Sequence, residues 1–174
     1  VEELYSTDEY KEKTREFLRE EFKYMRSFTK DIFTSFEEKS IVAQGEIMST
    51  NMVLNYLQEQ GIKATLLSAF DFMRTDKNAE PDAQYIKEKL TAIMTENEGY
   101  QIYITQGFIC LNAYGEIDNL QRGGSDFTAS LIGVALGAEE IQIWTDIDGM
   151  HNNDPRIVDE TEAIRQLNFE EAAE

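Results

Sequence analysis

The sequence predicts an α/β fold, a three-layer α/β/α sandwich with a mainly parallel sheet. Four short runs rich in β-branched and aromatic residues are separated by helical stretches, and this alternation is typical of a parallel sheet with helices on both faces. No repeat or low-complexity linker interrupts the pattern, and 174 residues are enough for one core. The predicted strands cover residues 41–43, 64–69, 101–110 and 140–145.

The helices that flank these strands are predicted from capping and stop signals. Ser6 and Glu9 have capping-box spacing, and an aromatic stripe at nearly helical intervals follows them. We interpret this stripe as a packing face against the sheet or another helix. A helix over 46–60 is followed by Gly61, and Asp82 can cap the next helix, which runs to about residue 97.

Composition excludes several classes of partner. The chain has 34 acidic and 16 basic residues, and its net charge of -18 repels nucleic acid and anionic lipid. A single cysteine, Cys110, rules out an internal disulfide and fits a reducing cytoplasm; we interpret it as a small buried hydrophobe. No apolar run approaches the roughly 18 residues of a membrane span, so we expect a cytoplasmic protein without a membrane partner.

The residues that favour a ligand site lie between positions 118 and 156. Arg122 and two glycines precede an apolar helix that Ser125 or Asp126 can cap and Gly137 can end. A helix start carries free N–H groups and a partial positive charge, so this loop favours an anion.

A second polar loop follows the last predicted strand. Thr145 and Asp146 end that strand, and Gly149 and an Asp-Pro-Arg sequence at 154–156 come next. Ligands of open α/β sheets bind beyond the carboxyl ends of parallel strands, so both loops are predicted to border one crevice.

The motifs in this order resemble those of the aspartokinases, members of the amino acid kinase family, from about Val42 to the C-terminus. The resemblance implies the amino acid kinase (carbamate kinase-like) form of the three-layer fold. The matching segments are Gly45-Glu46-Ile47-Met48-Ser49-Thr50, Glu80-Pro81-Asp82, Ile104-Thr105-Gln106-Gly107-Phe108-Ile109, Arg122-Gly123-Gly124-Ser125-Asp126-Phe127, Trp144-Thr145-Asp146-Ile147-Asp148-Gly149 and Asp154-Pro155-Arg156.

The resemblance implies phosphoryl transfer from MgATP to the β-carboxylate of L-aspartate, the first step of lysine, threonine and methionine biosynthesis. In the amino-acid half of the site it implies that Arg122 binds a substrate carboxylate and Glu46 pairs with the α-ammonium group. It also implies that Ser125 donates to a substrate carboxylate and that Asp126 has a catalytic role, orienting lysines from other segments.

The resemblance assigns the nucleotide half of the site to four residues. Thr145 and Asp146 match the nucleotide-binding pair at the strand edge, and Arg156 matches an arginine near the phosphates. His151 stands where related enzymes often have tyrosine, and an exposed loop histidine is the alternative interpretation. The implied cofactors are ATP and Mg²⁺, the metal being bound through the nucleotide.

The resemblance also implies that residues 1–174 form part of a catalytic domain. The opening Lys-Phe-Gly-Gly segment and the regulatory ACT domains of the family have no match here, so we expect the chain alone to be inactive and the full-length enzyme to be a homo-oligomer. Two alternatives stay open: another amino acid kinase such as glutamate 5-kinase, and a non-catalytic acidic interaction module.

Overall fold

Two parallel strands lie at the centre of the first of two compact units, Val1–Ile141 and Gln142–Glu174. The computed structural model describes residues 1–174 except 31–32, 122, 147–148, 155, 169 and 172–174. Strand β1 (Ala64–Leu67) pairs with β2 (Ile102–Thr105) in parallel, from Ala64 opposite Ile102 to Leu67 opposite Thr105. Within the described residues this sheet has two strands.

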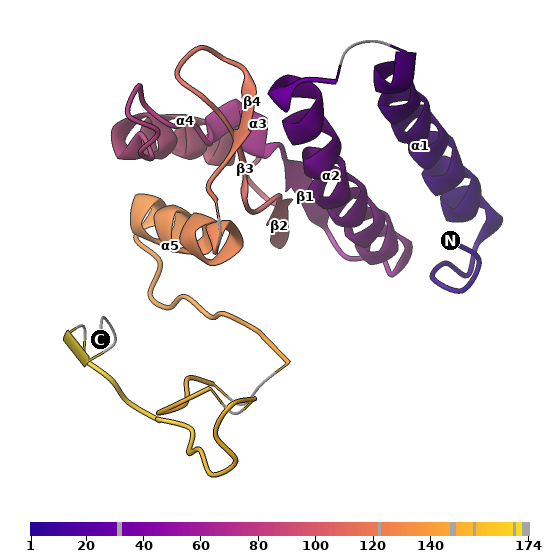
Figure 1. Ribbon diagram of the computed structural model, residues 1–174. Coiled ribbons are helices and arrows are strands. Elements are labelled where there is room, and N and C mark those ends of the chain that lie inside the picture. The colour runs from indigo at the N-terminus through magenta and orange to yellow at the C-terminus, as the bar shows by residue number, and fades with distance from the viewer. Residues whose placement is uncertain (31–32, 122, 147–148, 155, 169, 172–174) are drawn as a thin grey trace. The chain divides into compact units, whose positions relative to one another are not determined.

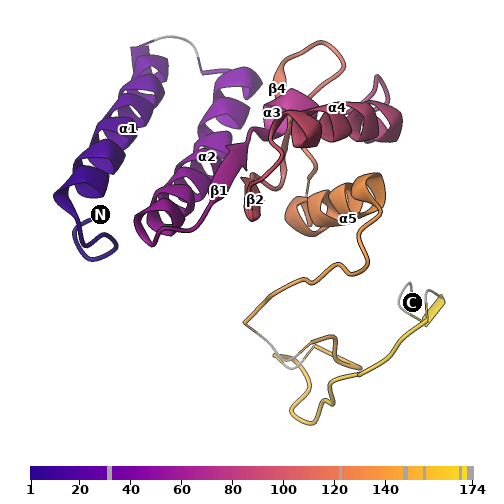
Figure 2. The ribbon, with the colours of Figure 1, turned by 180° about the vertical axis from the view of Figure 1, so that it is seen from behind.

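Helices cover both faces of the parallel pair, as Figures 1 and 2 show. Helix α2 (Ser35–Glu59) contacts β1 and β2 and separates them from α1 (Asp8–Ser27), which a short 3-10 turn, η1 (Phe28–Lys30), follows. Helices α4 (Ala83–Glu96) and α5 (Gly124–Leu136) lie on the other side and contact each other. The predicted α/β class, with helices on both faces of parallel strands, is therefore confirmed.

Apolar side chains from both strands and from α4 and α5 form the core of this unit. The short helix α3 (Ala69–Phe72) contributes Phe72, which is fully buried. Leu67, Leu90 and Ile132, from β1, α4 and α5, line an apolar cavity of about 210 Å³. None of the helices among the described residues is long and apolar enough to cross a membrane.

The predicted strand at 41–43 is wrong, because these residues lie inside α2. A capping box of Thr34 and Glu37 starts this helix well before the predicted strand. Ser40, Ala43 and Gln44 are buried at helical spacing, so burial of this stripe outweighs the β preference of the two branched residues between them.

The predicted single strand at 101–110 is divided into two. It breaks at Gln106–Phe108, where Phe108 takes a positive φ of 68°. Strand β3 (Ile109–Leu111) then pairs antiparallel with β4 (Ile117–Asn119), a strand that the sequence analysis did not predict.

The predicted strand at 140–145 is also wrong, because these residues adopt no strand pairing. Ile141 and Ile143 are exposed, and Trp144 is 88% exposed. The run has strand-forming residues, yet a strand needs a hydrogen-bonded neighbour, and the described structure supplies none along this run.

Two predicted helix caps are replaced by other groups. Helix α1 has Thr7 at its N-cap without a side-chain cap, and the Glu59 carboxylate accepts from the backbone N–H groups of Ser6 (3.0 Å) and Thr7 (2.7 Å). Gly123, not Ser125 or Asp126, is the N-cap of α5.

The predicted helix at 83–97 is confirmed at both ends. Asp82 caps α4 by accepting from the Tyr85 N–H at 3.2 Å, and Asn97 is its C-cap. Gly61, with φ 75°, lies just past the end of α2, as expected of a residue that stops a helix.

Candidate functional site

The carboxyl end of β2 is where two of the predicted substrate-binding elements meet. Three residues follow this strand, and together they contact α2, α3 and α5. Gln106 is buried and lies between α2 and α3, whereas Gly107 and Phe108 lie against the start of α5. This strand end therefore has the position at which open α/β folds bind ligands.

Glu46 lies in the middle of α2, half-buried, on the helix turn that ends at Thr50. The Thr50 hydroxyl donates to the Glu46 carbonyl at 2.7 Å and accepts from the Gln106 side-chain amide at 3.0 Å. Within the described part of the chain, the Glu46 carboxylate makes no hydrogen bond or ion pair. It is therefore available to a cationic group of a ligand.

The start of α5 is packed tightly against the residues that follow β2. A Cβ on Gly107 would lie 3.1 Å from the Cα, Cβ and Oγ of Ser125, and one on Gly124 would lie 2.9 Å from the Phe108 ring. The Thr128 hydroxyl accepts from the Phe108 N–H at 3.0 Å and donates to the Gly124 carbonyl at 2.7 Å. A Cβ at Gly124 would force a neighbouring atom to shift, and one at Gly107 would be tighter than ordinary van der Waals contact, so glycine suits both positions.

Ser125 and Asp126 are exposed in the first turn of α5. No side chain caps this helix, and the N-cap Gly123 adopts φ 75°. A helix start carries a partial positive charge, so an uncapped start suits an anion. Arg122, the predicted carboxylate-binding residue, lies outside the described residues.

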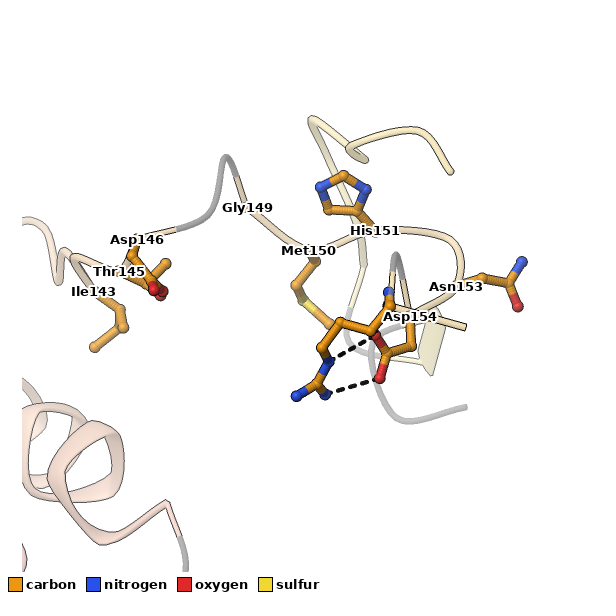
Figure 3. A pocket seen from close by; sticks show the side chains of 9 residues that line it. Ile143, Thr145, Asp146, Gly149, Met150, His151, Asn153 and Asp154 are labelled. Carbon is orange, nitrogen blue, oxygen red and sulfur yellow. Dashed lines mark hydrogen bonds and ion pairs between the residues drawn. The ribbon is translucent and has the colours of Figure 1, made fainter. Parts of the chain in front are cut away.

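The four predicted nucleotide-binding residues line one hollow of about 720 Å³ in the second unit. They are Thr145, Asp146, His151 and Arg156. Figure 3 shows Thr145 and Asp146 on one side of the hollow and His151 and Asp154 on the other. The sequence motifs that supplied these residues are therefore brought together in the structure, although no strand forms at 140–145.

Arg156 donates three hydrogen bonds to the carboxylate of Asp154. Its Nε and Nη2 donate to the two Asp154 oxygens at 3.0 and 2.8 Å, and its backbone N–H donates at 2.9 Å (Figure 3). These bonds lower the pKa of Asp154 to about 2, with the Arg156 side chain as the main cause. The guanidinium is 86% exposed, so its remaining N–H groups face solvent.

Three other polar side chains of the lining, those of Thr145, Asp146 and His151, take part in hydrogen bonds. The Thr145 hydroxyl donates to Asp146 Oδ1 at 3.3 Å, and His151 Nδ1 lies 3.0 Å from the Thr161 hydroxyl. Among the residues that the structure describes, no three His, Cys, Asp or Glu side chains cluster as metal ligands would.

Comparison with known proteins assigns the chain to a family. A model of the amino acid kinase family matches residues 4–174. The chain belongs to the amino acid kinase family. Lysine-sensitive aspartokinase 3 of Escherichia coli strain K12 is 40% identical over 139 residues, which are 77% of this chain and 30% of that protein. An aspartokinase of Chlamydia muridarum is 36% identical over 142 residues, 79% of this chain and 32% of that protein.

Solved structures give the same result for this amino acid kinase chain. The crystal structure of E. coli aspartokinase III in complex with aspartate and ADP matches with a TM-score of 0.77 and 32% identity, covering 86% of this chain and 35% of that one. The aspartate kinase of Clostridium acetobutylicum, at 23% identity and a TM-score of 0.69, supports the fold alone. The chain spans about a third of the length of the curated aspartokinases named above (30% and 32%).

Sequence reasoning missed two residues of this site, Thr50 and Gln106. Both stand in segments that carried the family resemblance, but no role was assigned to them. Their place in the matching segments Gly45–Thr50 and Ile104–Ile109 was the one sequence feature that could have indicated a role in the site. Their hydrogen bond joins residues 56 positions apart, and this separation hides it from any local pattern.

Proposed function

We propose that the native protein containing these residues transfers the γ-phosphoryl group of ATP to the β-carboxylate of L-aspartate, giving 4-phospho-L-aspartate and ADP. This is the first step of lysine, threonine and methionine biosynthesis. The observation that carries the proposal is the likeness, at 32% identity and a TM-score of 0.77, to an aspartokinase crystallised with aspartate and ADP.

The geometry of the first unit supports an amino-acid site at the end of β2. The Glu46 carboxylate, which pairs with none of the described residues, can bind an α-ammonium group, and the start of α5 with Ser125 suits a carboxylate. Arg122, directly before the glycine pair, adds a guanidinium whose paired donors match a carboxylate. Asp126, in the same first turn, is proposed to orient lysines near the transferred group.

The hollow of the second unit supports the nucleotide half of the site. About 720 Å³ is in the range of small-molecule pockets, and Thr145, Asp146, His151 and Arg156 line it. Mg²⁺ offsets phosphate charge and usually keeps waters and phosphates as ligands, so it can be bound through the nucleotide.

The proposed reaction needs no general base. An aspartate carboxylate, with an ordinary pKa of about 3.9, is already ionised at neutral pH. Residues of the site therefore contribute by aligning the two substrates and by placing positive charge near the transferred phosphoryl group. That local charge is needed because the net charge of -18 repels both substrates.

The proposal is tested by ADP release in the native protein with L-aspartate or L-glutamate as acceptor, and by two reciprocal variants. Arg122→Ala should raise the aspartate KM strongly, through a loss of binding free energy on the order of 2–4 kcal/mol, and leave the ATP KM nearly unchanged. Asp146→Ala should weaken ADP binding in calorimetry and spare aspartate. Glutamate-dependent turnover without aspartate-dependent turnover would assign the protein to another amino acid kinase, and loss of both ligands in either variant would indicate misfolding.

A further inference from the structure

One buried side chain joins three elements at the end of β2. Gln106 accepts from the backbone N–H of Ala69, the first residue of α3, at 2.9 Å. Its amide nitrogen donates to the Thr50 hydroxyl at 3.0 Å. Only 3% of Gln106 is exposed; its bond to Ala69 is buried, and its bond to Thr50 is partly buried.

The bond to Thr50 continues to the backbone of Glu46. The Thr50 hydroxyl donates to the Glu46 carbonyl at 2.7 Å. A hydroxyl has one proton to donate, so donation to Glu46 leaves it an acceptor for the amide of Gln106. The direction of each bond in the chain from Gln106 to Glu46 is therefore determined.

The residue after Gln106 contacts the other substrate-binding element. Gly107 approaches Ser125 so closely that a Cβ would meet three of its atoms at 3.1 Å. Two consecutive residues thus contact the α2 turn that carries Glu46 and the α5 turn that carries Ser125. The positive φ of Phe108, 68°, turns the chain directly after this junction.

We infer that Gln106 is a positioning residue of the amino-acid site, which acts through Thr50 to hold the α2 turn that presents Glu46 at the strand end where Ser125 is placed. The inference rests on the proposed function, because it assumes that Glu46 binds the amino acid substrate. Gln106 itself is buried and does not contact the substrate.

The test compares Thr50→Val, which removes the linking hydroxyl at nearly constant shape, with Thr50→Ser, which keeps it. In the native protein, Thr50→Val should raise the aspartate KM about tenfold, whereas kcat and the ATP KM change less than about twofold. Thr50→Ser should retain the wild-type KM. Thr95→Val is the matched control. The Thr95 hydroxyl also donates to a helix carbonyl, that of Thr91 at 2.9 Å, but Thr95 lies on the exposed side of α4.

A double-mutant cycle with Glu46→Gln separates positioning from general stability. If Thr50 acts through Glu46, Thr50→Val should change the aspartate KM less than about twofold in the Glu46→Gln background. Multiplicative effects of the two substitutions, an equal rise in both KM values, or an unchanged KM in Thr50→Val would each overturn the inference. Thr50→Ala replaces Thr50→Val if thermal melting shows that the valine variant is unfolded.

The same assays distinguish failure of the proposed function from failure of the inference about Gln106. Wild-type protein that releases no ADP with aspartate would overturn the proposed function and the inference together. Wild-type turnover with an unaltered Thr50→Val variant would overturn the inference alone.

Discussion

Cys110 is fully buried on β3, opposite Asp118 of β4. Burial raises the pKa of the thiol to about 12, and the Asp118 charge adds to this effect. Asp118 itself forms an ion pair with Lys39 at 2.8 Å. The sequence interpretation of Cys110 as a small buried hydrophobe agrees with this environment.

Cys110 should therefore resist alkylation at pH 8 in the folded protein and react fully in denaturant, as measured by mass after iodoacetamide treatment. Because its folded pKa is raised, the neutral thiol contributes stability below pH 9, and this contribution is lost as pH rises from about 9 towards 12. Rapid modification of native protein would contradict the buried position.

Asp82 combines a helix cap with an ion pair. One oxygen accepts from the Tyr85 N–H at 3.2 Å, and the other accepts from Arg74, whose guanidinium carbon lies 3.6 Å from the centre of the Tyr85 ring. Arg74 and the Tyr85 N–H both lower the pKa of Asp82, Arg74 more strongly.

Asp82→Ala should lower the free energy of unfolding by about 1–2 kcal/mol. Asp82→Asn should lower it by less, because asparagine also caps helices. The lowered pKa means that the Asp82 contribution is present above pH 3.8 and is lost as pH falls below that value. Urea titrations at pH 7 and pH 3 measure both effects. Equal losses in the two variants at pH 7 would show that the ion pair, not the cap, is the main contribution.

At the scale of elements, α2 continues through Gly45 without interruption. A Cβ on Gly45 would meet no atom within 4 Å, apart from the helix's own backbone, and Gly45 has no positive φ. Glycine in a helix interior costs roughly 0.5–1 kcal/mol relative to alanine, because the unfolded chain has more freedom.

Gly45→Ala should therefore raise the free energy of unfolding by about 0.5–1 kcal/mol, as measured by thermal or urea denaturation. Gly61→Ala is a suitable contrast, because Gly61 also has open space around it but adopts φ 75°, which strains alanine. A destabilised Gly45→Ala variant would favour the strand that the sequence predicted at 41–43, followed by a helix that starts at Glu46.

At the scale of the whole molecule, the chain consists of two units of different character. Val1–Ile141 holds all ten helices and strands with assigned bounds and the buried core, whereas the described part of Gln142–Glu174 is mostly irregular. The one tryptophan of the chain, Trp144, is 88% exposed near the start of the second unit, and its indole N–H donates to Gln142 at 3.1 Å.

Fluorescence of Trp144 in the 174-residue chain should therefore resemble that of free tryptophan in water, with nearly complete quenching by acrylamide. Acrylamide is neutral, so the net charge of -18 does not repel it. Blue-shifted, protected emission would show that residues 140–145 form the buried strand that the sequence predicted.

The elements that the sequence determined alone are those with local signals at both ends. Helix α4 starts at the Asp82 cap and ends at Asn97, and α5 ends at the predicted Gly137, whereas its N-cap is Gly123 and not the predicted Ser125 or Asp126. These signals act within one turn of the chain, so no distant residue is needed to interpret them. The four residues expected around the nucleotide were also gathered around one hollow.

Tertiary structure decided the elements whose partners are distant in the sequence. Residues 41–43 are helical because their buried stripe continues a helix started at Thr34, and the strand at 101–110 breaks where Gln106 bonds to Thr50 and Ala69. Strand pairing is likewise a contact between separate segments, so composition alone does not make the β-rich run at 140–145 a strand. The intrinsic preferences of the residues favour a helix or a strand, but the hydrogen-bonding and packing partners determine whether that element forms.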